Sequence, residues 1–436
     1  MIPWDNYRTP RGRSRGHKLV TIYFPFEVVT VAAMLVSARN GVLCTPLCLT
    51  GDFDSQLRHI LHEQTKSAGD PADILSRVSI DVQTTLNQRW HGEKTIYVKL
   101  IIYLLLFAGY KAIPFGSLAT GLFLPSSDID LFIQLPFYYP RNSGIEQEAY
   151  KLFKKQPQLY TNVIYIDQVN YSMLQFIHIP SQRNVDLMFK TGEMVVENSK
   201  LVKYYFNLDE RFFSLGIFLK FWFEIQNLNG HGRPIKYVLY LLIIFYLQQK
   251  NMVPPVYILQ KKSKSNIFRD WDMGFNELPY NSTNTENLHQ LLGGFFKLYS
   301  EFNYEEYVIA PFAGRPVRKS DFKDIENFPE EYALYSSNLK HKLKRLIINN
   351  FDVSIAACIQ DPFVHSFFHP IIEVSGLERY NETKTFKYFM KSVAKLFEDL
   401  PSESILSAIL VTDQHKNKQS SADGQHEQVC IDINSK

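Results

Sequence analysis

The sequence of 436 residues has little cysteine. Its four cysteines, at positions 44, 48, 358 and 430, are too few and too scattered for a disulfide framework. Cys44 and Cys48 have no second pair of ligands with the spacing of a zinc site. We therefore expect reduced thiols and an intracellular protein.

Long apolar runs are also lacking, which excludes an ordinary membrane-spanning helix in the regions that we expect to fold. The two most apolar runs, Leu100–Ala108 and Tyr237–Leu247, are shorter than the roughly 18 to 20 residues that cross a bilayer. We predict core helices there and no membrane partner. A further run, Val28–Ala38, follows a basic arm over residues 8–18. It fits a targeting sequence or anchor, but Glu27 and the long polar lead favour a flexible basic extension.

No strong charge of one sign dominates the chain, whose formal net charge is +3. Such a balance does not by itself indicate a nucleic-acid binder. The hydrophobic share of 45% and the aromatic share of 14% are typical of a globular protein, and the length suffices for two or three domains. No repeat of 20 to 50 residues is visible.

The middle of the chain predicts a small mixed β-sheet. Helical periodicity begins at Ser76, and Leu118–Leu122 reads as a short helix. Short apolar or alternating stretches predict strands over residues 112–115, 128–133, 171–179 and 184–189. We expect helices to cover one side of this sheet.

The second half predicts long helices and completes an α+β fold. They are expected at Arg211–Gln226, Lys236–Gln249, Thr285–Phe302 and Ser337–Asn349, with a loop-rich stretch over residues 254–285. We divide the chain into an N-terminal extension with its basic arm (1–70), a catalytic domain (71–200), a helical central domain (201–400) and a tail (412–436). The tail is polar and too poor in apolar residues to support a core, so we expect it to be disordered.

Two aspartates stand in the apolar stretch SSDIDLFI. Residues i and i+2 of a strand share a face, so Asp128 and Asp130 are expected side by side. Two neighbouring carboxylates repel each other unless a cation lies between them, and Mg²⁺ prefers hard oxygen ligands. Asp186, isolated in the predicted strand NVDLMF, would complete a two-metal site suited to phosphoryl or nucleotidyl transfer.

Gly116 and Ser117 precede these acids at a predicted strand-to-helix turn. Glycine there lets the backbone approach a ligand, and the Ser117 hydroxyl can bind a phosphate. A lone Asp-x-Asp is more often a solvated strand edge or turn, and a lone Gly-Ser is weaker still. The ordered combination, with eleven positions from Ser117 to Asp128 and a later apolar-flanked acid, favours the metal site.

This order of motifs resembles the DNA polymerase beta superfamily of nucleotidyltransferases. Further stretches narrow the resemblance to the template-independent terminal RNA nucleotidyltransferases, which include cytoplasmic-type poly(A) polymerases and terminal uridylyltransferases. They are, in order, FGSLATGLFLPSSDIDLFI, NVDLMF, NSKLVKYYFNLDERFFSLGIFLKFW, KYVLYLLIIFYLQ, ENLHQLLGGFFKLYSEFNYEEYVIAP and IQDPF. The resemblance covers roughly residues 75–395.

The resemblance implies an active site in a cleft between the catalytic and helical domains. Asp128, Asp130 and Asp186 would hold two Mg²⁺ or Mn²⁺ ions and carry the catalysis, with Asp186 helping to activate the RNA 3′-hydroxyl. The nucleotide would lie against Gly116, Ser117, Asn198, Lys220, Lys236, Tyr237, Asp361 and His365. Without the resemblance, Lys220 would be interpreted as a surface lysine and Tyr237 as ordinary core.

The chain departs from the family pattern in two places. Glu224 stands where a second lysine usually follows Lys220 by one helical turn, and Lys236 replaces a serine before the stacking tyrosine. An acid repels a triphosphate, so we hypothesise that Lys236 restores the missing positive charge. The histidines after Asp361, including His365, are out of the register expected for uracil recognition. Addition of adenine, uracil or both stays open.

Recognition of particular RNAs is not encoded by any appended RNA-binding module that we can identify. The substrates implied are an RNA 3′ end and nucleoside triphosphates, with an RNA-binding or adaptor protein choosing targets. Basic side chains at Lys340, Lys342, Lys344 and Arg345 could contact the RNA backbone, although a charge run is usually a solvated face. We expect a cytoplasmic location, with ribonucleoprotein granules, nucleus and mitochondrion left open.

Two alternatives to RNA tailing remain. A CCA-adding or oligoadenylate-forming enzyme is disfavoured because the NSKL and KYVLYLL motifs follow the RNA-tailing type. A catalytically inactive scaffold of the same fold is disfavoured by the three intact aspartates and favoured by Glu224.

Overall fold

The structure is a computed structural model. It describes residues 47–87, 111–134, 144–167, 172–189, 192–226, 228, 236–261, 263–268, 271–322, 329–335, 376–410 and 430–431. Among the helices in these ranges, none combines the length and the apolar character needed to cross a membrane. The basic arm, the run Val28–Ala38, the run Leu100–Ala108 and the predicted helix Ser337–Asn349 lie outside the described residues.

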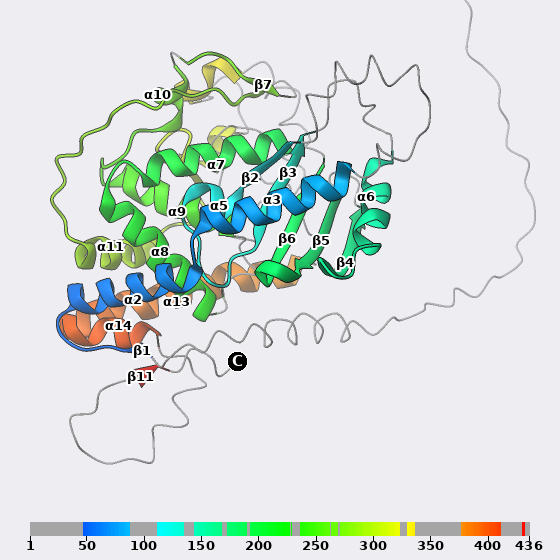
Figure 1. The fold of residues 1–436 in the computed structure, drawn as a ribbon. Helices are drawn as coiled ribbons and strands as arrows, with labels where there is room; N and C mark the ends of the chain where they lie inside the picture. The colour runs from blue at the N-terminus through cyan, green and yellow to red at the C-terminus, as the bar shows by residue number, and fades with distance from the viewer. Residues whose placement is uncertain are drawn as a thin grey trace, which may run out of the picture. The chain divides into compact units, whose positions relative to one another are not determined.

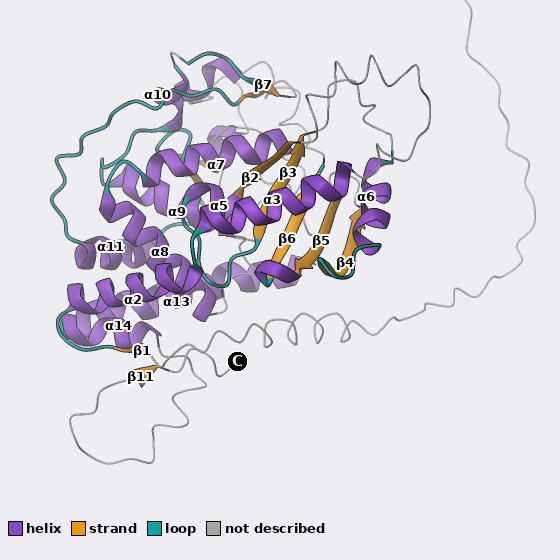
Figure 2. Cartoon of the chain, viewed as in Figure 1, coloured by secondary structure: helices purple, strands orange, loops and turns teal. Residues whose placement is uncertain are grey.

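A five-stranded mixed sheet forms the first half of the described chain (Figures 1 and 2). Its strands are β2 (Lys111–Phe115), β3 (Ile129–Gln134), β4 (Tyr160–Asp167), β5 (Ser172–His178) and β6 (Arg183–Met188), in the order β2-β3-β6-β5-β4. Only the β3–β6 pairing is parallel among these neighbours. The predicted mixed sheet is confirmed, and β4 is a strand that we did not predict.

Helices α3 (Pro71–Asn87) and α6 (Ile145–Lys154) cover one face of this sheet. Alternate side chains of the strands point to that face because the strand period is two. The resulting cluster contains Val78, Val82, Leu86, Ile129, Leu131, Ile133, Ile145, Ala149, Phe153, Tyr160, Leu174, Phe176, Val185, Leu187 and Phe189. The intervening side chains of β3 and β6 therefore face the other side, where the acids lie.

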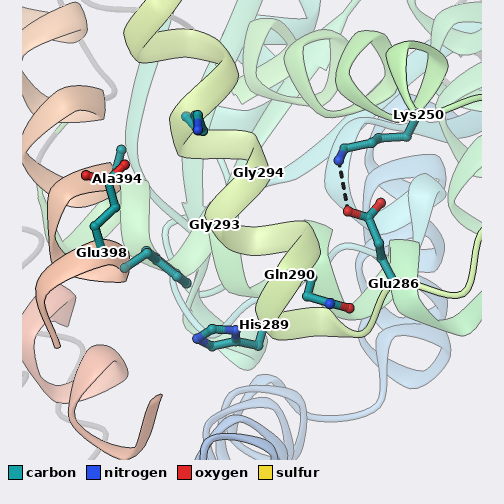
Figure 3. Close-up of a pocket in the computed structure, with 10 residues that line it drawn as sticks. Lys250, Glu286, His289, Gln290, Gly293, Gly294, Ala394 and Glu398 are labelled. Carbon is teal, nitrogen blue, oxygen red and sulfur yellow. Dashed lines mark hydrogen bonds and ion pairs between the residues drawn. The ribbon is translucent and has the colours of Figure 1, made fainter. Parts of the chain in front are cut away.

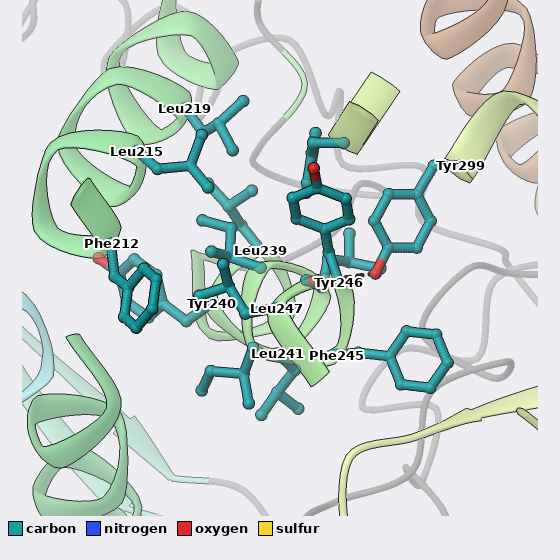
Figure 4. Packing of buried hydrophobic residues seen from close by; sticks show 14 of the residues in the cluster. Phe212, Leu215, Leu219, Leu239, Tyr240, Leu241, Phe245, Tyr246, Leu247 and Tyr299 are labelled. Atoms are coloured by element: carbon teal, nitrogen blue, oxygen red, sulfur yellow. Dashed lines mark hydrogen bonds between the residues drawn. The ribbon is translucent and has the colours of Figure 1, made fainter. Parts of the chain in front are cut away.

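A larger helical region follows. Its helices are α7 (Gly192–Phe206), α8 (Glu210–Ile225), α9 (Lys236–Gln249), α10 (Val256–Gln260), α11 (Leu288–Glu301), α13 (Gly376–Asp399) and α14 (Ser402–Leu410). Nearly every residue of α8 and α9 is buried, and Figure 4 shows their side chains packed together. A helix that is apolar all round belongs in a core. The predicted helix at 236–249 is confirmed with the same bounds, and those at 211–226 and 285–302 are confirmed to within three residues at each end.

Short elements complete the described chain. They are α5 (Gly116–Thr120), the hairpins β7 (Ile267–Phe268) with β8 (Trp271–Asp272) and β9 (Tyr307–Ala310) with β10 (Arg315–Arg318), and 3-10 helices at Ile179–Ser181, Lys319–Phe322 and Glu330–Tyr335. A two-residue strand β1 (Leu47–Cys48) pairs with β11 (Cys430–Ile431).

Helix α2 (Phe53–Ala68) lies within the range assigned to an N-terminal extension, yet its apolar side chains join the helical core. Phe53, Leu57 and Ile60 are buried, and the Gln56 amide donates to the Glu403 carbonyl of α14 at 2.6 Å. Residues 53–68 are thus part of the folded body. Likewise, β11 lies within the tail that we expected to be without a core, although residues 411–429 are outside the described part.

Candidate active site

Three acids share the sheet face opposite α3 and α6. Asp130 of β3 is the direct cross-strand partner of Asp186 on β6, because β3 and β6 pair in parallel register. Their strand neighbours Ile129, Leu131 and Val185 point into the sheet core, so the two carboxylates point away from it. The register therefore places Asp130 and Asp186 side by side on one face, whereas Asp128, predicted to begin the strand, lies just before it.

Amide side chains orient these carboxylates. Gln175, opposite Asp186 on β5, donates its Nε2 to Asp186 Oδ1 at 3.1 Å. Asn184, two residues before Asp186, donates its Nδ2 to Asp128 Oδ1 at 3.0 Å. Asp128 ends the loop before β3, and all three acids are partly exposed. Sequence analysis missed both amides, although Asn184 shares the face of Asp186 by the strand period.

Burial and mutual repulsion disfavour the ionised acids. Burial raises the pKa of Asp130 well above its ordinary value, and Asp186 and Asp128 raise it further. The pKa of Asp186 is raised to about 7, mainly by burial and then by the charge of Asp128. Such mutual effects require the three carboxylates to lie near one another. They create a local excess of negative charge that a cation would relieve.

Gly116 allows the Asp130 carboxylate to lie against the backbone. Its φ is +66°, a conformation that favours glycine, and a Cβ at this position would come within 2.1 Å of Asp130 Oδ2. The Gly116 N–H donates to Ser199 Oγ of α7 at 2.8 Å. The neighbouring Ser117 is buried, with 6% of its surface exposed. Gly116 therefore positions Asp130 directly, while the Ser117 hydroxyl is largely covered.

The Lys220 ammonium lies beneath the loop that leads to Asp128. The side chain is fully buried on α8 and donates to the Leu122 carbonyl at 2.7 Å and to Ser127 Oγ at 2.5 Å. Burial lowers the pKa of Lys220 to about 7. The structure thus gives this lysine contacts within the protein at the place where the resemblance implied phosphate contacts.

Glu224 and Lys236 form an ion pair beside the acids. The distance from Lys236 Nζ to Glu224 Oε1 is 3.6 Å, and the Ser126 hydroxyl donates to Glu224 Oε2. Burial alone would lower the pKa of Lys236, but Glu224, Asp128 and Asp130 outweigh it, and the pKa is raised. Lys236 therefore keeps its positive charge near the carboxylates. Sequence analysis identified both residues but not their pairing.

Two further predicted residues lie on the helices that flank the site. Asn198 of α7 is 7% exposed, and its side-chain oxygen Oδ1 is buried without a hydrogen-bond partner among the described residues. Tyr237 follows Lys236 at the start of α9 and packs partly buried against the helical core. An unpaired buried acceptor is costly, so Asn198 stands out as a side chain suited to a ligand donor.

The remaining predicted site residues are not placed. Asp361, His365, Lys340, Lys342, Lys344 and Arg345 lie outside the described residues. Within the described ranges, no three His, Cys, Asp or Glu side chains are arranged to hold a metal ion. The acids share one face but are turned to different partners, Asp128 to Asn184 and Asp186 to Gln175.

A pocket of about 350 Å³ lies elsewhere, between α11 and α13 (Figure 3). It is lined by Lys250, Glu286, His289, Gln290, Gly293, Gly294, Lys297, Ala394, Phe397 and Glu398. Lys250 follows the end of α9, whereas Lys236 begins that helix, and a helix of this length spans about 20 Å. The pocket is therefore separate from the three acids. The candidate site is located by its carboxylates and not by this pocket.

Two family models match parts of the chain. Residues 77–207 match the family model for the central palm domain of mitochondrial-like poly(A) RNA polymerases. Residues 287–367 match the family model for Cid1 family poly A polymerases. The first match contains Asp128, Asp130 and Asp186.

Several curated proteins are similar in sequence. Caffeine-induced protein 16 of Schizosaccharomyces pombe is 31% identical over 262 residues, which is 53% of this chain and 20% of that protein. Terminal uridylyltransferase cid1 of the same yeast is 26% identical over 222 residues, 46% of this chain and 51% of that protein. The inactive non-canonical poly(A) RNA polymerase protein Trf4-2 of Drosophila melanogaster is 28% identical over 139 residues, 31% of this chain and 33% of that protein. The chain thus spans between a fifth and a half of these relatives.

Solved structures share the fold. The structure of mtPAP in complex with GTP matches with a TM-score of 0.61 at 18% identity, covering 84% of this chain and 73% of that one. The Cid1 poly (U) polymerase with MgGTP bound matches with a TM-score of 0.58 at 17% identity, covering 81% of this chain and 97% of that one. The predicted α+β fold and the resemblance to template-independent RNA nucleotidyltransferases are confirmed.

Proposed function

We propose that this chain, similar in sequence and fold to template-independent RNA nucleotidyltransferases, adds ribonucleotides from nucleoside triphosphates to RNA 3′ ends. The observation that carries the proposal is the in-register pair of Asp130 and Asp186 on the sheet face away from α3 and α6, with Asp128 beside them. Three acids concentrated on one face, held by amides and an adjacent glycine, fit phosphoryl chemistry better than a structural role, because their repulsion costs stability.

Two divalent cations, Mg²⁺ or Mn²⁺, would be held by Asp128, Asp130 and Asp186. The donor set fits, since these are hard oxygen ligands whose mutual repulsion raises the pKa of Asp130 and Asp186. When bound, such ions supply charge neutralisation at the phosphates and acidify an attacking hydroxyl.

The protein's own groups would orient the substrates. Gln175 fixes the Asp186 carboxylate, and Asn184 fixes that of Asp128. Asp186 would lie nearest the RNA 3′-hydroxyl, while Lys236, whose charge persists beside the acids, would attract the triphosphate. Asn198 would accept a hydrogen bond from the ribose, and Tyr237 would stack on the base.

The base added and the RNA chosen are open parts of the proposal. Adenine, uracil or both are compatible with the described residues. We infer that an RNA-binding or adaptor protein supplies target choice and that the chain acts in the cytoplasm.

A second candidate is an inactive scaffold of the same fold. Two observations favour it: the described residues show no preformed metal-binding group, and Glu224 replaces the second lysine of the family pattern. The intact set of three acids favours the enzyme.

A tailing assay separates the two candidates. Purified chain, Mg²⁺ or Mn²⁺, a labelled oligo-RNA and each nucleoside triphosphate in turn should yield extended RNA. The double variant Asp128→Ala/Asp130→Ala should lose on the order of 10³-fold in rate while keeping its circular dichroism spectrum. Absence of extension by the wild-type chain with every nucleotide and both metals, or equal extension by the double variant, would contradict the proposal.

A further inference from the structure

One face of α8 holds the loop that leads to Asp128. Lys220 and Glu224 are four residues apart and therefore lie on the same side of the helix. Lys220 donates to Ser127 Oγ at 2.5 Å, and Glu224 accepts from the Ser126 hydroxyl. One helical turn thus contacts two consecutive serines immediately before Asp128.

The opposite side of this loop is held by β6. The Arg183 guanidinium donates to the Pro125 carbonyl and, at 2.8 Å, to the Ala68 carbonyl, and it lies 5.2 Å from the centre of the Phe123 ring. The loop is therefore held between β6 and α8, and Ser126 lies two residues before Asp128.

Glu224 uses its second oxygen for a different helix. Its Oε1 lies 3.6 Å from Lys236 Nζ at the start of α9, and both side chains are at least 65% buried, with 18% and 35% of their surfaces exposed. A partly buried charge that loses its partner is destabilising, so this pair restricts where the Lys236 ammonium can lie. The same carboxylate accepts from Ser126, two residues before Asp128, so the ion pair joins the start of α9 to the loop that carries this acid.

We propose that Glu224 is a positioning residue for the incoming nucleoside triphosphate. It holds the Lys236 side chain of α9 and the turn at Ser126 in place. The ammonium group that faces the phosphates is then Lys236 of α9 rather than a second lysine of α8. This inference rests on the proposed function and deepens it. Lys220, one turn earlier on α8, contacts the same loop through the Leu122 carbonyl and Ser127 Oγ.

Glu224 could affect nucleotide binding in a second way, by charge repulsion of the triphosphate alone. If Glu224 merely repels phosphate, replacing it with the lysine of the family pattern should tighten nucleotide binding. If Glu224 positions Lys236 and Ser126, the same replacement places two ammonium groups together and removes the acceptor of Ser126, so binding should weaken. The two accounts therefore differ in sign for one substitution.

The experiment compares Glu224→Lys, Glu224→Gln and the charge swap Glu224→Lys/Lys236→Glu in the full chain. Dissociation constants for ATP and UTP are measured by titration calorimetry in Mg²⁺ without RNA, and kcat and KM are measured with RNA. Glu224→Lys should raise the nucleotide dissociation constant and KM about tenfold, with a smaller change in kcat. Glu224→Gln keeps an acceptor for Ser126, so its nucleotide affinity should fall only about threefold. The charge swap should recover part of the affinity that Glu224→Lys loses.

Glu210→Lys is the matched control, because Glu210 is an exposed acid in the first turn of the same helix. It should leave nucleotide affinity unchanged. Thermal unfolding identifies any variant that has lost its fold, and Glu224→Gln, which is nearly isosteric, then carries the comparison. Tighter binding by Glu224→Lys or Glu224→Gln, or no change in either, overturns the positioning role.

Failure of the proposed function would look different. If the wild-type chain binds neither nucleotide and extends no RNA, both proposals fall together. If the wild-type chain binds and extends but Glu224→Lys binds more tightly, only the positioning role is lost.

Discussion

Polar side chains lie in different environments in the sheet and in the helical region. In the sheet, successive side chains of β3 and β6 point to opposite faces, so that Leu131 and Leu187 enter the core while Asp130 and Asp186 face away from it. In the helical region, α8 and α9 are buried nearly all round, and Lys220 lies fully buried among apolar neighbours. The sheet thus gathers mutually repelling carboxylates on one face, whereas α8 buries the Lys220 ammonium where it has hydrogen-bond partners.

This difference separates two energetic roles. The sheet acids repel one another, and the cost is tolerable only if a ligand or cation relieves it. The polar groups of α8 are paired with the loop over residues 121–127 and stabilise the position of Asp128. Removing a sheet-face acid should therefore stabilise the chain, whereas crowding Gly116 or changing the packing and caps of the helical region should destabilise it, and four predictions test this contrast.

The largest effect is expected at Asp186, whose folded pKa is raised from 3.8 to about 7. The folded chain holds this proton more tightly than the unfolded chain, so its stability falls as the pH rises from about 4 to 7 and then levels off. Asp186→Asn should remove this loss. The difference in free energy of unfolding between the variant and the wild-type chain should therefore rise by on the order of 3 to 4 kcal/mol from pH 4 to pH 8, since a tenfold change in an acid constant is worth about 1.4 kcal/mol. Urea unfolding across this pH range measures it.

Magnesium sharpens the same comparison. If the acids hold cations, Mg²⁺ at pH 8 should raise the Tm of the wild-type chain and have little effect on Asp186→Asn. A wild-type chain whose stability is flat between pH 4 and 7, or an Asp186→Asn variant that is less stable at pH 8, would contradict the repulsion described for the sheet face.

The second prediction concerns Gly116, where the sheet face has no room for a side chain. Gly116→Ala combines an unfavourable φ of +66° with a Cβ 2.1 Å from Asp130 Oδ2, so we expect a loss of about 2 to 3 kcal/mol. Gly144→Ala is the matched control, because Gly144 has a φ of +67° and, within the part of the chain that the structure describes, no neighbouring atom within 4 Å of the added Cβ. Denaturant unfolding should show a clearly smaller loss for Gly144→Ala; equal losses would mean that the Asp130 contact is unimportant.

Much of the fold could be predicted because its patterns are local. The alternation around Leu131 and Leu187 gave the strands, and the continuous apolar run of α9 gave a buried helix with the observed bounds. Strand β4 was missed because its face away from the sheet core is exposed, as at Ile164, and its alternation is broken by Asn162 at a positive φ. Helix α2 was missed although its signals are local, with Phe53, Leu57 and Ile60 at helical spacing after the N-cap Asp52.

The candidate site divides in the same way. Asp128, Asp130 and Asp186 stand out in the sequence because charge interrupts apolar strands. The partners of Lys220 and the pairing of Glu224 with Lys236 depend on how α8, α9 and the loop pack, and no local pattern encodes them. Sequence spacing therefore locates the acids but cannot tell a phosphate-facing lysine from one that supports the loop.

The third prediction tests the packing of the helical region at Gly216 in α8. An alanine there gains up to about 1 kcal/mol in helix propensity, but its Cβ would lie 2.4 Å from Phe206 Cε1. Overpacking typically costs about 1 to 3 kcal/mol, so Gly216→Ala should be destabilising by about 1 to 2 kcal/mol. Adding Phe206→Leu should recover part of the loss in denaturant unfolding, and a stabilised Gly216→Ala chain would show that this contact is loose.

The smallest effect is expected at the surface of the helical region, where Asn287 caps α11. Its side chain accepts from the Gln290 N–H at 2.9 Å, and the Gln290 side chain accepts from the Asn287 N–H at 2.9 Å. Asn287→Ala removes one of these reciprocal bonds and should cost about 1 kcal/mol, whereas Asn287→Ser keeps a cap and should stay within about 0.5 kcal/mol of wild type. Because this cap has no role at the acids, nucleotide affinity should not change. A loss of affinity in Asn287→Ala without unfolding would mean that α11 and the sheet face are coupled more tightly than their separate packing indicates.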